Sequence, residues 1–166
     1  TDLNGCTAIK TQLFTVNPLP NPTIPGNTTL CAGSTTTLSP GAGFNNYLWS
    51  TGATSSSITA STSGLYQVTV TDANGCSETA SITLTFYPLP TPVITGDQTI
   101  CNGETSTLNA GSGYINYVWS DGNLNQYNNA TGAGIYVVTV TDSNNCVGTS
   151  PPFPLTVLFG HANITY

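Results

Sequence analysis

Residues 66–76 read YQVTVTDANGC, and the same pattern returns as YVVTVTDSNNC at residues 136–146. Apolar and polar residues alternate along the start of these stretches, which is the pattern of a β-strand with one buried face. Tyr66, Val68 and Val70 are therefore predicted to point inward together. These stretches decide the fold class, because they make the strand the basic element of the chain.

The residues after each strand favour a tight hairpin turn. The first stretch contains Asn74 and Gly75, a pair that closes two-residue hairpin loops. Asn145 takes the place of that glycine in the second stretch, and asparagine tolerates the left-handed backbone that such a turn requires. Residues 81–86 (SITLTF) are predicted to form the partner strand.

The turn motif recurs at a step of 70 residues: TDLNGC at residues 1–6 returns as TDANGC at 71–76 and as TDSNNC at 141–146. A period this long indicates one whole domain per repeat, because solenoid repeats are about 20 to 50 residues long. The chain is expected to be an excerpt of a longer tandem array. Its predicted parts are the last strand of a preceding repeat (1–17), a first repeat (18–87), a second repeat (88–158), and a linker or the start of a next domain (159–166).

Further short strands lie between Gly, Pro and Asn turns. Helical periodicity is absent, so the sequence predicts an all-β chain with an antiparallel β-sandwich of about seven strands in each repeat. The predicted strands are TTTLS (35–39), NYLWS (46–50) and SSSITAS (55–61) in the first repeat, and TSTLN (105–109) and NYVWS (116–120) in the second.

The fifth strand of the second repeat departs from this pattern. Asn128 stands where the first repeat has Ile58, so an apolar position has become polar. Tyr127 or Leu124 is expected to fill the space that the isoleucine leaves.

The charge of the chain excludes several classes of protein. Lys10 is the only basic side chain apart from one histidine, and the formal net charge is -6. Nucleic acids are held chiefly by Lys and Arg on phosphates, so neither a nucleic-acid partner nor an anionic lipid surface is expected. No apolar run approaches the ~20 residues that cross a bilayer, so no membrane insertion is expected either.

The Pro-rich joints at residues 17–22 and 87–92 are predicted to be stiff, short spacers.

Four motifs together carry a resemblance to a known family. C-x-G before the second strand, Y-x-W-S, S-G-x-Y-x-V-T-V-T-D and N-G-C resemble the immunoglobulin-like repeats of very large secreted surface adhesins of gliding bacteria. The resemblance implies tandem immunoglobulin-like sandwiches in a secreted or cell-surface protein, where they form an adhesive shaft or filament. Its partners would be neighbouring repeats or subunits, with surface polysaccharide as a further candidate. Similar modules also occur on secreted enzymes, so a carbohydrate-binding or spacer module of a secreted hydrolase is the alternative.

The cysteines recur at intervals of 25 and 45 residues, two in each repeat, which indicates a repeated disulfide in an oxidising compartment. Pairing within a repeat would join Cys31 to Cys76 and Cys101 to Cys146. In the usual sandwich, however, Cys31 and Cys76 lie at opposite poles, about 20 Å apart across six strand residues. A bond between Cys31 and Cys146, across the junction of the repeats, is therefore slightly favoured. Cys6 would then pair outside this excerpt.

Aromatic residues are predicted to anchor the core. Trp49 and Trp119 lie mid-strand, as the core tryptophan of a sandwich does, although exposed tryptophans could also stack on sugars. Tyr66 and Tyr136 are predicted anchors of the neighbouring strand. Tyr47 and Tyr117 are expected to pack on the same strand face as the tryptophans, whereas Phe44 and Tyr114, in the preceding loops, are candidates for contact with a ligand or neighbour.

No constellation of residues suggests catalysis. The only histidine, His161, falls outside both repeats, and no carboxylate pair recurs at a useful separation. Asp72 and Asp142 are expected to form turns and not a calcium site, which needs six to eight oxygens. No enzyme activity, cofactor or metal is expected. Asn27, Asn129 and Asn163 begin glycosylation sequons, which say little in a bacterial protein.

Overall fold

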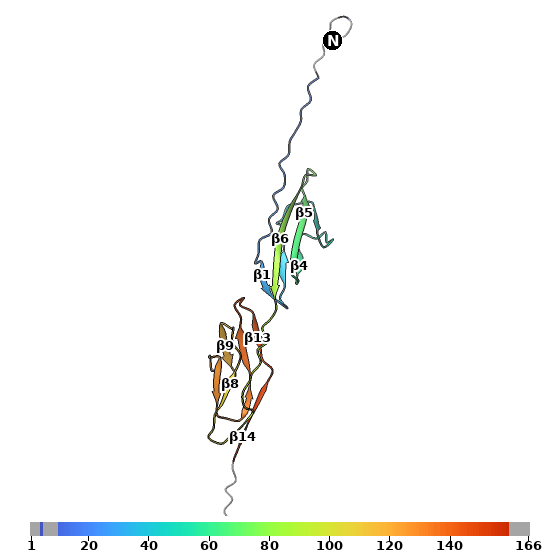
Figure 1. Ribbon diagram of the computed structural model, residues 1–166. Coiled ribbons are helices and arrows are strands. Elements are labelled where there is room, and N and C mark those ends of the chain that lie inside the picture. Colours follow the sequence, from blue (N-terminus) through green and yellow to red (C-terminus); the bar gives the residue numbers. More distant parts are fainter. Residues whose placement is uncertain (1–3, 5–9, 160–166) are drawn as a thin grey trace, which may run out of the picture. The chain divides into compact units, whose positions relative to one another are not determined.

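The computed structural model describes residue 4 and residues 10–159, and Figure 1 traces them as strands and loops. No helix occurs in this described part of the chain, so the prediction of an all-β protein is confirmed. Three predicted features lie outside the described residues: Cys6, His161 and the sequon at Asn163.

The first repeat contains six strands in two sheets. One sheet has four strands in the order β1-β6-β5-β3, and the other pairs β2 with β4. This is the two-sheet arrangement of an immunoglobulin-like sandwich. The strands are β1 (Thr29–Cys31), β2 (Thr36–Leu38), β3 (Asn46–Trp49), β4 (Ile58–Ala60), β5 (Gly64–Thr71) and β6 (Ser77–Tyr87).

The second repeat has the same plan with two interruptions. Its sheets have the orders β11-β14-β7, β13-β12-β9 and β10-β8. Val137 separates two strands where the first repeat has one, and Pro151 and Pro152 separate another two, because proline has no N–H to donate to a neighbouring strand. The strands are β7 (Thr99–Cys101), β8 (Ser106–Asn109), β9 (Asn116–Trp119), β10 (Tyr127–Ala130), β11 (Gly134–Tyr136), β12 (Val138–Thr141), β13 (Val147–Thr149) and β14 (Phe153–Leu158).

The described strand pairs are antiparallel except where the first strand of a repeat meets the last. There the pairing is parallel: Thr29 lies opposite Thr85 in β1 and β6, and Thr99 lies opposite Thr156 in β7 and β14. Between the two repeats, Thr29 and Thr99 are offset by 70 residues, whereas their partners Thr85 and Thr156 are offset by 71. The second repeat therefore carries one extra residue in the break before β14.

The alternation along β5 and β12 places their valines in the core. Val68, Val70, Val138 and Val140 are fully buried, while Tyr66 and Tyr136 are half-buried. In the second repeat the buried residues form one apolar cluster: Ile94, Ile100, Leu108, Ala110, Trp119, Ala130, Val138, Val140, Phe153 and Leu155. Leu38, Trp49, Ala60 and Leu84 are also buried in the first repeat.

The expectation for the fifth strand of the second repeat is wrong. Asn128 is itself buried, at 3% exposed, whereas Tyr127 and Leu124 are exposed. The Asn128 amide donates to Oδ2 of Asp121 at 2.7 Å, and its Oδ1 accepts from the Asn123 amide at 3.2 Å. A buried amide that is hydrogen-bonded in this way avoids the cost of burying an unpaired polar group.

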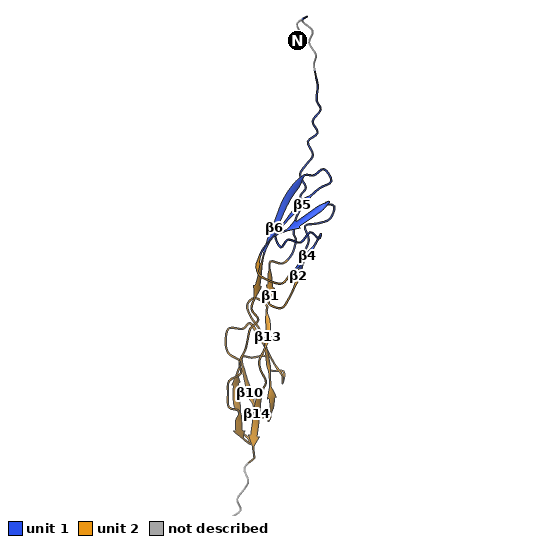
Figure 2. Cartoon of the chain, turned by 90° about the vertical axis from the view of Figure 1, so that its right-hand side faces the viewer, with its two compact units in different colours: residues 1–26, 37–59, 65–83 blue, residues 27–36, 60–64, 84–166 orange. Residues whose placement is uncertain are grey.

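The described residues form two compact units, shown in Figure 2, which differ from the repeats of the sequence. Unit 1 takes its residues from 1–26, 37–59 and 65–83, and unit 2 takes them from 27–36, 60–64 and 84–166. Strand β1 belongs to unit 2. Residues 10–17 carry no strand, and most of the earlier part of the segment 1–17, for which a last strand was predicted, lies outside the described residues.

Candidate functional site

A disulfide bond joins Cys31 to Cys146 within unit 2. The two Cα atoms are 5.5 Å apart, which lies inside the range that a disulfide can span. The partners are 115 residues apart in sequence and come from different repeats. The bond is therefore the one across the junction, and Cys31 is not joined to Cys76.

The turn between β12 and β13 holds Cys146 in place. Oδ1 of Asp142 accepts the backbone N–H of Asn144 at 2.9 Å and that of Cys146 at 2.8 Å. The Asp142 N–H in turn donates to the Cys146 carbonyl at 2.9 Å. Asn145 has φ of 63°, the left-handed conformation that asparagine tolerates. The carboxylate of Asp142 thus serves the turn, and Cys146 is completely buried.

The other half of the disulfide is held by the end of β1. Cys31 lies opposite Tyr87 in the parallel pair, and the next N–H, of Ala32, donates to the Tyr87 carbonyl at 2.7 Å. The Cys31 carbonyl accepts the N–H of Ser34 at 3.1 Å and also the Ser34 hydroxyl. Gly33 makes this turn with φ of 83°. Cys146 is thus positioned by its own turn, and Cys31 by its turn and by the pairing of β1 with β6.

The Pro-rich joint lies directly against strand β13. A Cβ placed on Gly148 would stand 1.8 Å from the carbonyl oxygen of Pro90, closer than any two such atoms can approach. Only a glycine fits there. The first repeat has Glu78 at the corresponding position, and this difference between the repeats is the sequence signal of the close approach.

Two further cysteines of the described chain are free. Cys76 ends the turn between β5 and β6 and is half-buried, and Cys101 ends β7 and is exposed. They occupy the same places in their repeats as Cys146 and Cys31, respectively.

The tryptophans are unavailable to a ligand. Trp49 and Trp119 are each 2% exposed. Their indole N–H groups donate to the carbonyls of Ser55 at 2.9 Å and Asn125 at 2.8 Å, so each polar tip has a partner inside the fold. These side chains therefore cannot offer the flat, open faces on which sugars stack.

The loop aromatics pack on tyrosines of their own repeat. Phe44 meets Tyr47 edge-on with ring centroids 6.0 Å apart, and Tyr114 meets Tyr117 in the same way at 5.8 Å. The Tyr117 hydroxyl also donates to the Gly111 carbonyl at 3.0 Å. Phe44 and Tyr114 were predicted to contact a ligand or neighbour, and the structure places both of them in half-buried internal contacts.

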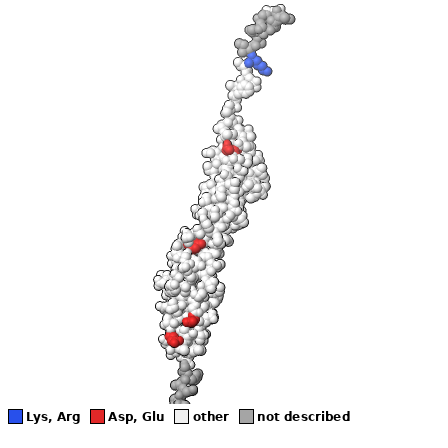
Figure 3. Space-filling model, viewed as in Figure 1, with Lys and Arg blue, Asp and Glu red and all other residues white. Residues whose placement is uncertain are grey.

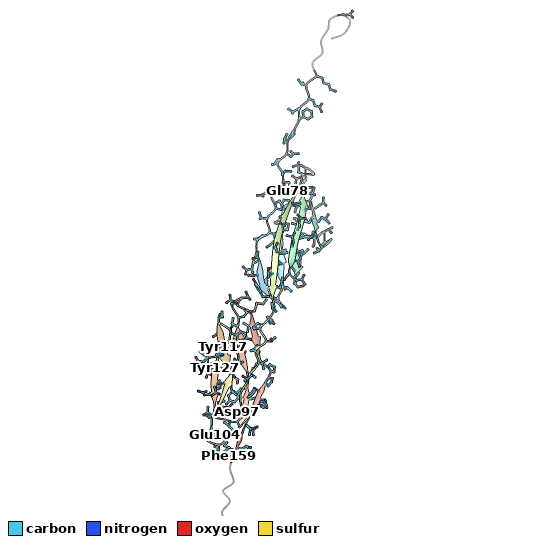
Figure 4. All side chains as sticks on the ribbon, viewed as in Figure 1. Glu78, Asp97, Glu104, Tyr117, Tyr127 and Phe159 are labelled. Atoms are coloured by element: carbon cyan, nitrogen blue, oxygen red, sulfur yellow. A yellow bond between two sulfur atoms is a disulfide. The ribbon has the colours of Figure 1, made fainter. Side chains whose placement is uncertain are left out.

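Exposed aromatic rings are few and separate. Among the described residues they are Phe14, Tyr127 and Phe159. Figure 4 shows Tyr127 on β10 and Phe159 beyond the end of β14, well apart from each other. These two rings make no continuous stacking platform on unit 2.

The described residues contain no cluster of three metal-ligating side chains and no detectable pocket. Figure 3 shows a basic side chain near the N-terminal end of the chain and a few separate acidic side chains, on a face that is otherwise uncharged. None of the described segments forms a helix long and apolar enough to span a membrane. The candidate functional site of the described residues is therefore the Cys31–Cys146 disulfide with the two turns that hold its cysteines.

No known protein-family model matches the sequence, and no curated protein matches it. Several solved structures resemble the chain distantly. Murine CEACAM1b is 14% identical, with a TM-score of 0.36 over 79% of this chain and 96% of that one. A 1.5-MDa bacterial ice-binding adhesin is 18% identical, with a TM-score of 0.40 over 88% of this chain and 67% of that one. Fibronectin(III)-like modules of Clostridium thermocellum CbhA are 12% identical, with a TM-score of 0.39 over 83% and 92%. All three TM-scores are below 0.5, so no conclusion about this chain follows from these likenesses.

Proposed function

We propose that this chain is a structural segment of an extracellular bacterial protein, a shaft built of immunoglobulin-like repeats that transmits force and performs no catalysis. The observation that carries the proposal is the disulfide between Cys31 and Cys146, which connects one repeat covalently to the next. A bond of this kind within a single repeat would stabilise a domain, whereas a bond between repeats reinforces their junction.

The disulfide also supports a location outside the cytoplasm. Disulfides persist in oxidising compartments and are rare where thiols are kept reduced. The near absence of basic side chains fits a surface that contacts neither nucleic acid nor anionic lipid. We infer a secreted or cell-surface protein, with neighbouring repeats as its first partners and an adhesin of the gliding-bacteria class as its specific type.

The bond would limit how far the chain can extend under load. Residues between Cys31 and Cys146 lie inside a closed covalent loop, so pulling on the two ends cannot straighten them. The partners are 115 residues apart, and an extended chain spans at most ~3.3–3.6 Å per residue, so about 400 Å of length stays locked. A filament with this crosslink resists lengthening even after its sandwiches unfold.

Force spectroscopy on the full chain tests the proposal. With the disulfide intact, complete unfolding should release about 400 Å less contour length than in reducing buffer. Cys31→Ser should release the full length in either buffer, and the control Cys101→Ser should retain the difference. Equal contour lengths with and without reductant for the unmodified chain would refute a load-bearing crosslink.

The alternative function is a carbohydrate-binding or spacer module of a secreted hydrolase. The burial of Trp49 and Trp119 counts against sugar stacking, because the usual platform is an exposed aromatic face. Tyr127 is the one exposed ring on a described strand. A glycan array probed with the full chain separates the two functions: saccharide binding that Tyr127→Ala abolishes would favour the alternative.

A further inference from the structure

We propose that Cys76 and Cys101 are two complementary half-sites of a second crosslink, through which the chain bonds head to tail with another copy of the repeat. The inference rests on the proposed function, since it extends the Cys31–Cys146 link beyond this pair of repeats. The hairpin cysteine of one copy would bond to the first-strand cysteine of another, which is the kind of pair already formed in the chain.

Cys76 lies in a turn that already has the bonded conformation. Oδ1 of Asp72 accepts the N–H of Asn74 at 2.9 Å and that of Cys76 at 2.8 Å, the same two distances found around Cys146. The Asp72 N–H donates to the Cys76 carbonyl at 2.9 Å, again as in the bonded turn. Gly75 supplies the left-handed residue with φ of 82°. The turn is thus formed in advance, without a partner cysteine.

Cys101 is held in the same way as Cys31. It lies opposite Leu158 in a parallel pair, and the following N–H, of Asn102, donates to the Leu158 carbonyl at 2.9 Å. The Cys101 carbonyl accepts the N–H of Glu104 at 3.0 Å, where Ser34 makes the equivalent bond in the first repeat. Oε2 of Glu104 also accepts the Cys101 N–H at 2.9 Å, which fixes the turn from its other side.

Burial distinguishes the free half-sites from the bonded ones. Cys146 is fully buried and its counterpart Cys76 is half-buried; Cys31 is half-buried and its counterpart Cys101 is exposed. Each free cysteine is therefore more open than the bonded cysteine at the same place. A partner repeat would provide the missing cover.

The chemistry needs a disulfide oxidant, for which oxidised glutathione is sufficient. The Cys101 thiolate attacks one glutathione sulfur, which forms a mixed disulfide and releases one glutathione thiolate. The Cys76 thiolate of another copy then attacks the Cys101 sulfur, the Cys76–Cys101 bond forms, and the second glutathione leaves as a thiolate. Two protein thiols are oxidised and one glutathione disulfide is reduced to two thiols, which take up the two protons.

The two half-sites differ from each other, so the contact is heterologous. Contacts of this kind build open chains when the rotation between copies does not close a ring. Repeated bonding of Cys101 in one copy to Cys76 in the next would therefore lengthen a filament. Each new bond would be of the same kind as the disulfide that already joins the two repeats.

The experiment uses two full-length variants, both carrying Cys6→Ser to remove the remaining cysteine of the same motif. One also carries Cys76→Ser and keeps Cys101; the other carries Cys101→Ser and keeps Cys76. Each is incubated in glutathione redox buffer alone and in a mixture, and the products are separated on non-reducing gels and mapped by mass spectrometry. We expect the mixture to give a Cys76–Cys101 heterodimer at least about tenfold faster than either variant forms a homodimer, because only this pair joins unlike half-sites.

Two outcomes would overturn the proposal: homodimers that form as fast as the heterodimer, or no dimer at all. Asp72→Ala in the Cys76 variant is the matched control, because it loosens the turn and leaves the thiol in place. This substitution should slow heterodimer formation. An unchanged rate would contradict the idea that the Asp72 turn holds Cys76 ready for bonding. The force experiment depends only on the Cys31–Cys146 bond, so a failure of heterodimer formation leaves the proposed function standing, whereas a failure of the force experiment would remove the basis of both.

Discussion

The turn between β5 and β6 and the turn between β12 and β13 have the same backbone geometry but different chemical states. In both, an aspartate Oδ1 accepts two N–H groups at 2.9 and 2.8 Å. Cys76 in the first turn is free, whereas Cys146 in the second is bonded to Cys31. The comparison teaches that the turn is a local property of five or so residues, while the bond depends on a partner that another repeat supplies.

Strands β4 and β10 make a second comparison between the repeats. Ile58 is half-buried in β4, and Asn128 is almost completely buried at the corresponding place in β10. The change to asparagine is accompanied by changes at the two residues that bind it, so that no buried side-chain polar atom lacks a partner in the described part of the chain. The first repeat has Thr51, Ala53 and Ile58 where the second has Asp121, Asn123 and Asn128.

The largest expected effect tests the bonded cysteine against its free counterpart. A 100-residue loop closed by a disulfide gains ~4.7 kcal/mol in the chain-entropy model, so Cys31→Ser should lower the free energy of global unfolding by about 5 kcal/mol. Denaturant unfolding of the oxidised protein measures it. The matched variant Cys101→Ser should stay within about 0.5 kcal/mol of the unmodified chain. Equal losses in the two variants would remove the distinction between the positions.

The next effect concerns the joint against β13. Gly148→Ala should destabilise the protein by about 2–3 kcal/mol, because its Cβ would meet the backbone oxygen of Pro90, which cannot move aside like a flexible side chain. Gly134→Ala is the control, since a Cβ there meets nothing within 4 Å. Thermal unfolding followed by circular dichroism compares the two. A Gly148→Ala protein as stable as Gly134→Ala would contradict the close approach.

A third effect tests the polar contacts of β10. Asp121→Ala removes the acceptor of the Asn128 amide and should cost about 2 kcal/mol, since a buried donor is left unsatisfied. Thr51→Ala, at the corresponding position of the first repeat, should change the stability by less than about 0.5 kcal/mol. Adding Asn128→Ile to Asp121→Ala should restore part of the loss, and a further loss would mean that the amide has another role.

The smallest effect concerns Tyr136, the last residue of β11. Its hydroxyl donates to the carbonyl of Gly132, in the loop before that strand, at 3.0 Å. Tyr136→Phe should lose about 1 kcal/mol of unfolding free energy, the usual contribution of one hydrogen bond. The exposed Tyr127 provides the control as Tyr127→Phe, which should leave the stability unchanged. The two denaturation midpoints are compared directly.

The repeat step, the all-β class and the alternation that buries Val68 and Val138 can all be read from the sequence. It also indicated the aspartate turns and the mid-strand tryptophans. These features follow from patterns within a few neighbouring residues, because strand faces alternate with every residue and turns select particular backbone conformations.

The pairing of the cysteines, the direction of Asn128 and the contact at Gly148 come instead from the folded structure. Each of these depends on residues from distant parts of the chain. Cys146 bonds to a residue 115 positions away, and Gly148 meets the carbonyl of Pro90 from the preceding joint. Asn128 turns inward because Asp121 and Asn123 form hydrogen bonds with its amide. A pattern of apolar residues alone does not predict these partners.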